Sequence, residues 1–374
     1  PSNSSAASDV YKRQGYNLVY TPHIARMDLW RISGHLEFYQ DYLYSPMDIE
    51  GQKYILKPMN CLGHIAIYKT KIRSYRDLPI RYAELGTVYR YERSGVLHGL
   101  SRVRGFTQDD AHIFCRPDQL EDEVVKVLEL ALFMIDTFGF QNYQLLLSTR
   151  PEKYAGTVEI WDEATETLRQ ALERAGLHYE IDPGEGVFYG PKIDIKFESA
   201  LGKAWQGPTI QVDFNLPPRF DVTYIGEDGH EHMVVMVHRT VLGSMERFLA
   251  TLLEHYGGAF PVWLAPVQVR IIPVTDRHLN YAYDIETKLK EDEIRAEVDL
   301  RAERINSKIR QAQLEKIPYM LVVGDKEVEN NTVSVRLRSG QQIADQPLES
   351  FKKIVKSAII NRVKDVEVGG DKVN

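Results

Sequence analysis

The segment Arg104–Phe114, RGFTQDDAHIF, places two aspartates, a glutamine and a histidine among aromatic and apolar residues. Successive side chains of a β-strand point to opposite faces, so residues two apart share one face at a spacing of about 6.6 Å. The row on one face of this predicted strand consists of Phe106, Gln108, Asp110, His112 and Phe114. This row raises the question of which ligand an amide, a carboxylate and an imidazole side by side would bind. The adjacent Asp109 faces the other way, and we predict that its role is structural.

Length and composition are those of an ordinary globular protein. The chain has 374 residues, of which 43% are hydrophobic and 26% are charged, and this length suggests roughly two or three domains. No stretch approaches the roughly 18 to 20 consecutive apolar residues of a membrane-spanning helix. The only two cysteines, Cys61 and Cys115, exclude a disulfide framework and favour a reducing, cytoplasmic compartment.

The charge is distributed unevenly. The net charge of −7 argues against nucleic-acid binding over the whole surface. From Arg301 to the C-terminus there are 14 Lys and Arg and 10 Asp and Glu, a balance of +4; the totals of 46 and 53 then leave 32 and 43, a balance of −11, for residues 1–300. A basic C-terminal part permits a polyanionic partner there, although scatter in surface charge explains the same count.

Two changes in composition divide the chain. Residues 1–14, PSNSSAASDVYKRQ, have no periodicity and lack the apolar region of a signal peptide, so we exclude them from the fold as a foreign-looking tail. A joint rich in Gly and Pro, GGAFPVWLAP at 257–266, separates a first domain, 15–261, from a second, 262–374. Consecutive strands with inserted helices predict an antiparallel sheet and an α+β fold for the first domain. Alternating strands and helices predict an α/β second domain with a largely parallel sheet.

The apolar pattern predicts the individual elements. In the first domain we expect strands at 16–21, 84–92, 104–114 and 144–148, and helices at 61–71, 118–138 and 158–175. A strand at 231–237 is expected to run straight into a helix at 240–256. In the second domain, expected strands at 267–274, 296–300, 319–323 and 332–338 are joined by expected helices at 279–292, 305–316 and 348–362.

Three residues are candidate metal ligands. Zinc prefers thiolate and imidazole ligands, and a catalytic zinc has three protein ligands and one open position. Cys61, His112 and His238 each lie near a predicted strand or helix start, but they are 51 and 126 residues apart. Their spacing alone therefore does not distinguish a zinc site from buried, inert side chains.

A second group of residues suits a nucleotide. Arg90 and Glu92 share a face of one predicted strand, and Phe106 on the opposite strand presents a ring on which a base can stack. Arg102 flanks the loop between these strands, and Arg247 lies among small residues of a predicted helix. A planar guanidinium matches phosphate oxygens, although a single arginine of this kind is more often an ordinary surface residue.

These residues leave three classes of protein open: a nucleotide-using ligase, a zinc hydrolase, and a nucleic-acid-binding module without enzymatic activity. A zinc hydrolase should contain a compact ligand pair such as HExxH, which the sequence lacks. A pure binding module has no need for the arginines, the glutamate and the metal ligands in the acidic part of the chain.

Several motifs resemble those of the class II aminoacyl-tRNA synthetases. RYE at 90–92 with the following loop and RGFTQDDAHIF is similar to the second motif of that class, VHRTVLGSMER at 237–247 to its third, and the strand before Pro22 to the end of its first. Within the class, the resemblance is to the threonyl-tRNA synthetases, through KPMNC (57–61), STRPEKYAG (148–156), FYGPKID (188–194) and FPVWLAPVQV (260–269). It extends from about residue 15 to about residue 362, and the joint occurrence of these motifs in this order makes it specific.

The resemblance implies a role for each matching residue. The implied zinc ligands are Cys61, His112 and His238. The implied ATP contacts are Arg90 at the α-phosphate, Glu92 at the adenine edge, Phe106 stacked on the base, Arg102 and Arg247 at the triphosphate tail, and Gln206 and Thr209. The implied amino-acid pocket consists of Gln108, Asp110, Tyr189, Lys192 and Gln211. The implied catalytic residues are Arg90, Arg247 and His35, the last assisting transfer to the terminal ribose, and Glu327 and Arg336 are the implied anticodon-binding residues.

The implied fold is an antiparallel sheet flanked by helices, with the zinc site, followed by an α/β anticodon-binding domain. The implied activity is that of a threonine–tRNA ligase: threonine and ATP, with Mg²⁺, form threonyl-adenylate, and threonine is then transferred to tRNA(Thr). Zinc would select threonine through its amino and hydroxyl groups. The main alternative is a synthetase-like relative that binds tRNA or a regulatory partner without charging it.

The resemblance also implies a homodimer. In the family, the helix before the position of Pro22 contributes to the dimer interface, and residues 1–14 stand in its place here. An N-terminal editing region, which commonly removes mischarged serine in this family, is not among the matching segments, so we expect this chain to form seryl-tRNA.

Overall fold

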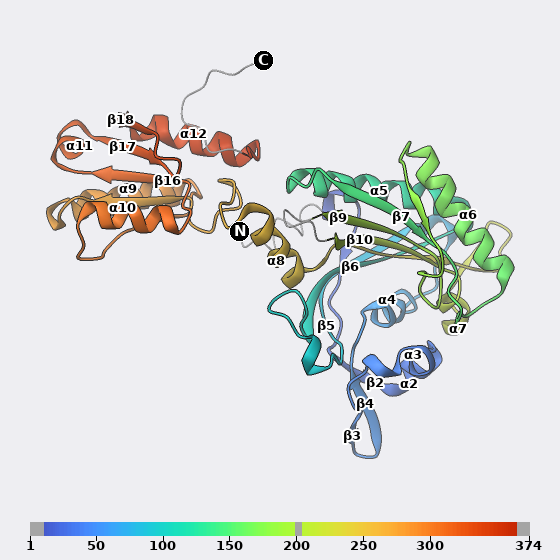
Figure 1. Ribbon diagram of the computed structural model, residues 1–374. Coiled ribbons are helices and arrows are strands. Elements are labelled where there is room, and N and C mark those ends of the chain that lie inside the picture. The colour runs from blue at the N-terminus through green and yellow to red at the C-terminus, as the bar shows by residue number, and fades with distance from the viewer. Residues whose placement is uncertain (1–10, 199–203, 365–374) are drawn as a thin grey trace. The chain divides into compact units, whose positions relative to one another are not determined.

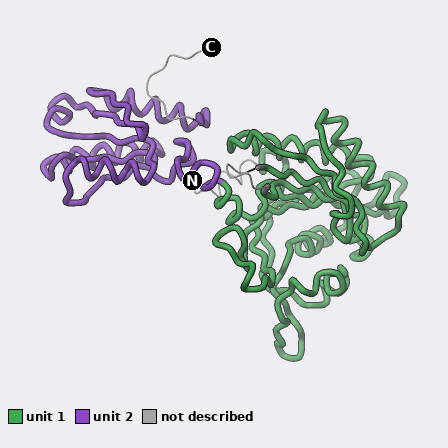
Figure 2. Tube along the Cα trace, viewed as in Figure 1, with its two compact units in different colours: residues 1–251 green, residues 252–374 purple. Residues whose placement is uncertain are grey.

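A computed structural model describes residues 11–198 and 204–364 of the chain (Figure 1). The chain divides into two compact units, 1–251 and 252–374 (Figure 2). The division falls inside helix α8 (Met245–Tyr256), whereas the sequence places the boundary after this helix, at 261/262. Within the described ranges, no helix is long and apolar enough to span a membrane.

An eight-stranded sheet forms the centre of the first unit, with the strand order β1-β5-β6-β13-β10-β9-β7-β8. The strands are β1 (Asn17–Leu18), β5 (Ile80–Tyr89), β6 (Gly105–Cys115), β7 (Tyr143–Ser148), β8 (Glu180–Asp182), β9 (Lys192–Glu198), β10 (Ala204–Asp213) and β13 (Val235–Ser244). Neighbours are antiparallel except at the two edges, where β1 with β5 and β7 with β8 are parallel. The predicted antiparallel sheet and the α+β class are confirmed.

Helices cover both faces of this sheet (Figure 1). On one face, α5 (Leu120–Thr137) and α6 (Val158–Arg174) pack on each other and on the central strands. On the other face, α4 (Cys61–Tyr68) contacts β6 and α7 (Leu216–Phe220) contacts β13. A buried cluster with Ile65, Tyr68 and Phe114 joins α4 to the sheet, so the start of α4 is fixed against the polar row of β6.

Smaller elements surround α4. A three-stranded sheet has the order β2-β4-β3, and a two-stranded sheet pairs β11 with β12. Their bounds and those of two short helices are β2 (Ile24–Arg26), α2 (Met27–Ile32), α3 (His35–Phe38), β3 (Met47–Ile49), β4 (Gln52–Leu56), β11 (Thr223–Ile225) and β12 (Glu231–Met233).

The start of α8 departs most from the sequence prediction. The expected strand 231–237 and helix 240–256 are wrong in their shared boundary, because β13 continues to Ser244 and the helix begins at Met245. The Asp109 carboxylate explains this difference, since it accepts hydrogen bonds at 2.8 to 3.0 Å from the backbone N–H groups of residues 241, 242 and 243. These N–H groups are therefore satisfied in a bulge instead of a helical turn.

Gly243 completes this bulge. Its φ of +75° lies in the left-handed region that glycine adopts without steric strain. The pairing of β13 with β6 shifts register between Thr240 and Ser244. The Ser244 hydroxyl then accepts a hydrogen bond from the Arg247 N–H at 3.2 Å, so Ser244 precedes the helix that contains Arg247.

Other predicted bounds in the first unit shift by a few residues. β5 ends at Tyr89, because the N–H of Tyr91 leaves the ladder and donates to the Tyr42 carbonyl at 2.8 Å. Arg90 and Glu92 therefore follow the strand instead of belonging to it, although the Arg90 N–H still donates to the Arg104 carbonyl at 2.9 Å.

The second unit contains a five-stranded sheet with the order β15-β14-β16-β17-β18 and four helices among its described residues. The elements are β14 (Val269–Pro273), α9 (Leu279–Glu291), β15 (Ala296–Val298), α10 (Ile305–Leu314), β16 (Tyr319–Val323), α11 (Asp325–Asn330), β17 (Thr332–Leu337), β18 (Gln342–Pro347) and α12 (Leu348–Ile360). Its core includes Ile271, Leu321 and Phe351, all fully buried.

The expectation of a largely parallel sheet in this unit is only half right. β14 is parallel to β15 and β16, but β16 with β17 and β17 with β18 are antiparallel. A parallel connection requires a crossover of about a dozen residues or more, and the segment between Val323 and Thr332 is shorter than that. The sheet is therefore mixed.

Candidate active site

The register of four neighbouring strands places polar side chains in two rows. The first row runs across β6, β13, β10 and β9 through the paired residues His112, His238, Gln211 and Lys192. The second row consists of Asp110, Thr240, Thr209 and Asp194, paired in the same order. Because residues two apart on a strand share a face, both rows lie on one side of the sheet.

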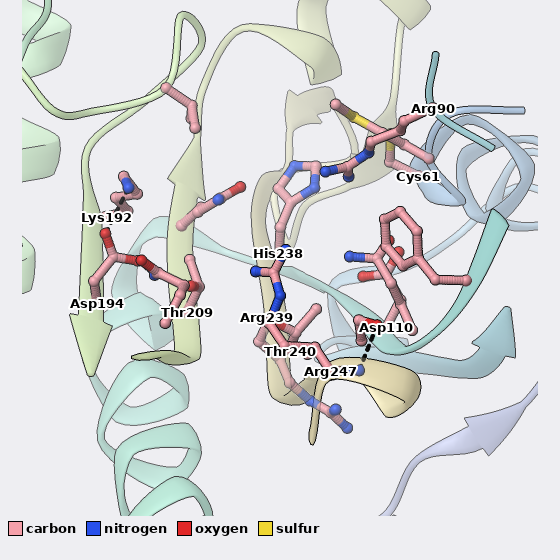
Figure 3. Close-up of a pocket in the computed structure, with 18 of the residues that line it drawn as sticks. Cys61, Arg90, Asp110, Lys192, Asp194, Thr209, His238, Arg239, Thr240 and Arg247 are labelled. Atoms are coloured by element: carbon pink, nitrogen blue, oxygen red, sulfur yellow. Dashed lines mark hydrogen bonds and ion pairs between the residues drawn. The ribbon is translucent and has the colours of Figure 1, made fainter. Parts of the chain in front are cut away.

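These rows line a cavity of about 490 Å³. Cys61 of α4 closes one side and Arg247 of α8 another, while Phe188 and Tyr189 come from the segment before β9. Figure 3 shows His238 between Cys61 and Arg90 on one side and Lys192, Asp194 and Thr209 on the other. The cavity brings together the predicted site residues of the first domain except His35: Cys61, Arg90, Glu92, Arg102, Phe106, Gln108, Asp110, His112, Tyr189, Lys192, Gln206, Thr209, Gln211, His238 and Arg247.

The three candidate metal ligands form a compact cluster at this cavity. One ligand atom each from Cys61, His112 and His238 lies within 4.8 Å of the other two, and all three residues are buried. Within the described part of the chain, this is the one group of three or more His, Cys, Asp or Glu side chains with such proximity. One thiol and two imidazoles, with the cavity on the remaining side, fit a zinc ion that keeps an open position.

The two histidines have partners that leave one ring nitrogen available. His238 Nε2 lies 2.9 Å from Asp213 Oδ2, so Nδ1 is available to the cluster. His112 Nδ1 lies 2.8 Å from His64 Nδ1, so Nε2 is available. Metal-binding histidines usually donate their other N–H to a partner of this kind, which fixes the ring orientation.

The protonation of the Cys61 thiol depends on whether a cation is bound beside it. Burial, followed by the charges of Asp110 and Asp213, raises the pKa of the Cys61 thiol. Without a cation the thiol is therefore protonated, and a thiolate ligand requires a positive charge beside it.

Three arginines converge on another part of the cavity. Arg90 lies 5.2 Å from the ring centroid of Phe106, and Arg102 Nη2 lies 3.1 Å from Glu92 Oε2. Arg247 Nε donates to the carbonyl of Ser101 at 3.0 Å. Burial, and then the charges of Arg90 and Arg102, lower the pKa of Arg247, so a bound polyanion would relieve the repulsion among these guanidinium groups.

Asp194 organises the side of the cavity opposite Cys61. Its carboxylate accepts hydrogen bonds from Gln206 Nε2 at 2.6 Å and from Thr209 Oγ1 at 2.8 Å. Lys192 Nζ lies 2.5 Å from the other carboxylate oxygen. Three predicted substrate-binding residues therefore share one buried carboxylate.

Asp110 and its neighbours form the wall next to the metal cluster. Asp110 Oδ2 accepts a hydrogen bond from Asn60 Nδ2 at 3.0 Å, and burial raises the pKa of this carboxyl group. The Tyr189 hydroxyl donates to Gln211 Oε1 at 2.5 Å. Gln108 lines the cavity two residues before Asp110, as strand alternation predicts.

His35 is fully buried and does not line the cavity. Its Nδ1 lies 2.7 Å from Ser33 Oγ and its Nε2 lies 3.0 Å from Met59 Sδ, while Met59 and Phe188 line the cavity beside it. Burial, and then the charges of His238 and Arg90, lower the pKa of His35 to about 3. The imidazole is therefore neutral at ordinary pH, and its predicted catalytic role stays a prediction.

Asp109 lies on the opposite face of β6 in a buried ion pair. One of its oxygens lies 3.6 Å from Arg239 Nη1, with both side chains fully buried. Oδ2 also accepts a hydrogen bond from the Tyr11 hydroxyl at 2.7 Å, so the last part of the excluded segment 1–14 contacts the core. Tyr11 and Tyr16 flank Arg239, each ring centroid 4.5 Å from the guanidinium carbon.

The predicted anticodon-binding residues lie in the second unit. Glu327 of α11 accepts hydrogen bonds from the Gly324 N–H at 2.9 Å and from the Ser334 hydroxyl at 2.7 Å. Arg336 lies two residues after Ser334 on β17, and its buried Nε atom has no hydrogen-bond partner in the described structure. Strand alternation places Ser334 and Arg336 on one face.

Several residues that contact the predicted site residues were not themselves predicted from the sequence. Asp194 and Asp213 are two residues after Lys192 and Gln211, so strand alternation alone would have placed them on the same face. His64 is three residues after Cys61 on a helix, a spacing that also puts both on one face. For Asn60 the sequence offers no comparable signal.

Comparison with known proteins defines the class. Residues 42–256 match the family described as the tRNA synthetase class II core domain (G, H, P, S and T), and residues 268–358 match the anticodon binding domain family. Together with the sheet, the arginines and the cavity, these matches define a class II aminoacyl-tRNA synthetase core followed by an anticodon-binding domain.

Individual relatives narrow the class further. A threonine–tRNA ligase of Dehalococcoides mccartyi is 65% identical over 352 residues, which cover 94% of this chain and 60% of that protein. That of Sulfurihydrogenibium sp. is 57% identical over 350 residues, covering 94% and 54%. A crystal structure titled as the RNA binding domain of threonyl-tRNA synthetase from Cryptosporidium parvum is 40% identical with a TM-score of 0.90, covering 95% and 89%. The chain belongs to the threonyl-tRNA synthetase family, as the motifs predicted, and spans 60% or less of the length of these two ligases.

Proposed function

We propose that this chain has threonine–tRNA ligase activity, in which ATP activates threonine to threonyl-adenylate and threonine is then transferred to tRNA(Thr). The observation that carries the proposal is that the three arginines and the Cys61–His112–His238 cluster open into one cavity. A cavity with only one of these groups would suit a nucleotide-binding or a metal-binding protein equally well.

ATP is assigned to the end of the cavity with the arginines. Arg90, Arg102 and Arg247 neutralise the triphosphate, which enters with Mg²⁺, and the adenine ring stacks on Phe106 with its edge at Glu92. Gln206 and Thr209 extend the nucleotide site from β10. Attack of the threonine carboxylate on the α-phosphorus then depends mainly on alignment and on charge neutralisation.

Threonine is assigned to the wall next to the metal cluster. Cys61, His112 and His238 would hold zinc, a Lewis acid that can bind the amino group and the side-chain hydroxyl of threonine. Asp110 accepts a hydrogen bond from that hydroxyl, while Gln108, Tyr189, Lys192 and Gln211 line the rest of the pocket. Valine has no hydroxyl and would leave the second oxygen of the buried Asp110 carboxylate without a hydrogen bond, which gives discrimination of about 10⁴-fold or more.

Transfer and tRNA recognition involve further predicted residues. His35 is assigned to the transfer step, in which it would accept a proton from the terminal ribose hydroxyl once a tRNA end displaces Met59 or Phe188, which contact its ring. Glu327 and Arg336 are assigned to the anticodon. A homodimer and a cytoplasmic location complete the proposal.

Threonine-dependent exchange of pyrophosphate into ATP tests the activation step. We expect exchange with threonine, its loss on incubation with a zinc chelator, and its return when zinc is restored. Charging of a tRNA(Thr) transcript, compared with a transcript whose anticodon is altered, tests the second step. A folded, zinc-loaded chain without threonine-dependent exchange would contradict the proposal and favour a protein that binds tRNA without charging it.

A further inference from the structure

The hydrogen bonds around His112 continue through two further buried residues, His64 and Glu84. We propose that these two are positioning residues that fix His112 in the tautomer whose Nε2 lone pair faces Cys61 and His238. The inference rests on the zinc centre of the proposed function and adds residues that act on it without contacting it.

For neutral imidazoles, hydrogen-bond valence fixes the direction of each bond. Glu84 is an acceptor, because its carboxylate already receives the Thr21 N–H at 3.0 Å, the Thr21 hydroxyl at 2.8 Å and Lys57 Nζ at 3.1 Å. His64 Nε2, 3.1 Å from Glu84 Oε2, therefore carries the proton and donates it. A neutral imidazole has one N–H, so His64 Nδ1 accepts.

The hydrogen bond to His64 determines the tautomer of His112. Its Nδ1 lies 2.8 Å from His64 Nδ1, and two nitrogens at this distance need one donor and one acceptor. Because His64 Nδ1 accepts, His112 Nδ1 must donate. Its Nε2 then carries a lone pair, which is the state that a metal ligand requires.

The fold makes this arrangement rigid. His64 and Glu84 are 0% and 2% exposed, so water has little access to exchange for either hydrogen bond. His64 lies one helical turn after Cys61 on α4, and Glu84 pairs across the β5–β6 ladder with Asp110. Two ligands of the cluster are thus linked through His64: Cys61 through the helix and His112 through the hydrogen bond.

His238 provides an internal comparison. Its Nε2 contacts the Asp213 carboxylate directly at 2.9 Å, and Asp213 Oδ1 accepts the N–H groups of Asn215 and Leu216 at 2.7 and 2.9 Å. One histidine ligand is therefore oriented by a carboxylate alone, and the other by a carboxylate through a second histidine.

Nitrogen-15 NMR of histidine-labelled wild-type protein tests the tautomers directly. We expect His112 to be protonated at Nδ1 and unprotonated at Nε2, and His64 to be protonated at Nε2 and unprotonated at Nδ1. Either imidazole in the opposite tautomer would overturn the proposal. This measurement needs no variant, so it tests the two tautomers even where a substitution unfolds the protein.

Zinc affinity, measured by competition with a chromophoric chelator, tests the consequence. His64→Leu and Glu84→Gln should bind zinc about 10- to 100-fold more weakly, the usual effect of removing the partner of a ligand. His64→Asn should bind nearly as tightly as wild type, because its carbonyl can replace the Nδ1 acceptor. Glu123→Gln is the matched control: Glu123 is equally buried, but it pairs with Arg81 and Lys126 on another part of the unit.

The outcomes separate this proposal from the one on which it rests. Equal affinity of His64→Leu and wild type, or an equal loss in His64→Asn and His64→Leu, would contradict the positioning role. Zinc binding that is absent in wild type, or unchanged in Cys61→Ser, would instead refute the proposed metal centre, while the tautomers would still be measured in the metal-free protein.

Discussion

Asp109 and Asp110 lie on opposite faces of β6, so their substitution by asparagine, one at a time, should have different effects. Asp110→Asn should affect substrate binding, and Asp109→Asn should affect stability. Asp110 Oδ2 accepts a hydrogen bond from Asn60 at 3.0 Å, so its second oxygen is the one available to a substrate hydroxyl. Asp110→Asn has nearly the same shape but a single acceptor oxygen. The variant therefore loses the charged acceptor, and its single, uncharged oxygen can face either Asn60 or the substrate hydroxyl.

The size of the effect follows from the charge on the acceptor. A hydrogen bond to a charged group contributes about 1.5–3 kcal/mol, which corresponds to a decrease of about 10- to 160-fold in kcat/KM for threonine. Valine forms no such bond, so the threonine-to-valine ratio should fall by the same factor. The free energy of unfolding should change little, because the substitution removes a buried carboxylate. Burial already disfavours the charged form of this group and raises its pKa.

Asp109→Asn should act on stability instead. The carboxylate accepts three backbone N–H groups and the Tyr11 hydroxyl and pairs with the buried Arg239. An amide cannot accept all of these bonds, and loss of one partner of a buried ion pair costs about 3–5 kcal/mol. We expect a decrease of about this size in the free energy of unfolding, with the threonine-to-valine ratio unchanged in the folded protein.

The two variants are compared by pyrophosphate–ATP exchange with threonine and with valine, and by urea unfolding. If Asp109→Asn lowered the substrate ratio while Asp110→Asn lowered only the stability, the assignment of the two faces of β6 would be wrong.

Three further predictions concern other residues. Arg247→Ala should lower kcat/KM for ATP in the exchange reaction about 10²- to 10³-fold, whereas Arg31→Ala, which removes an exposed arginine, should leave it unchanged; equal effects would contradict the assignment. Arg336→Ala should raise KM for tRNA(Thr) in charging without changing exchange, which needs no tRNA, and a change in exchange instead would exclude an anticodon role. Burial lowers the pKa of His35 from its ordinary 6.5 to about 3. The contribution of the neutral His35 to stability is therefore complete above pH 6.5 and is lost as the pH falls toward 3. In urea unfolding at several pH values, the free energy of unfolding should fall less steeply with decreasing pH for His35→Asn than for wild type.

The sequence predicted the cavity-lining face of β6 well, because strand alternation needs only local information. Phe106, Gln108, Asp110 and His112 share the cavity side of β6, as their parity requires. Parity does not specify which strands are neighbours, however, and the pairing of His112 with His238 and of His238 with Gln211 depends on the register of the whole sheet.

Long-range contacts explain the errors. The start of α8 was misplaced because Asp109, more than 130 residues away, binds the N–H groups that a helix would use. Glu84 was missed because nothing in its own segment indicates a metal site, and the proposed role of His64 and Glu84 depends on contacts among α4, β5 and β6. Such contacts outweigh local helical and strand preferences, which are small per residue.

Amino-acid discrimination in two cysteine variants tests the central claim most directly. Cys61 and Cys115 are both buried, but only Cys61 belongs to the cluster at the cavity. In pyrophosphate–ATP exchange with zinc-loaded protein, we expect a threonine-to-valine ratio in kcat/KM of about 10⁴ or more for wild type and for Cys115→Ser, and about 10² or less for Cys61→Ser, the limit for a pocket that cannot bind the hydroxyl. A Cys61→Ser protein that retains the wild-type ratio would contradict the account.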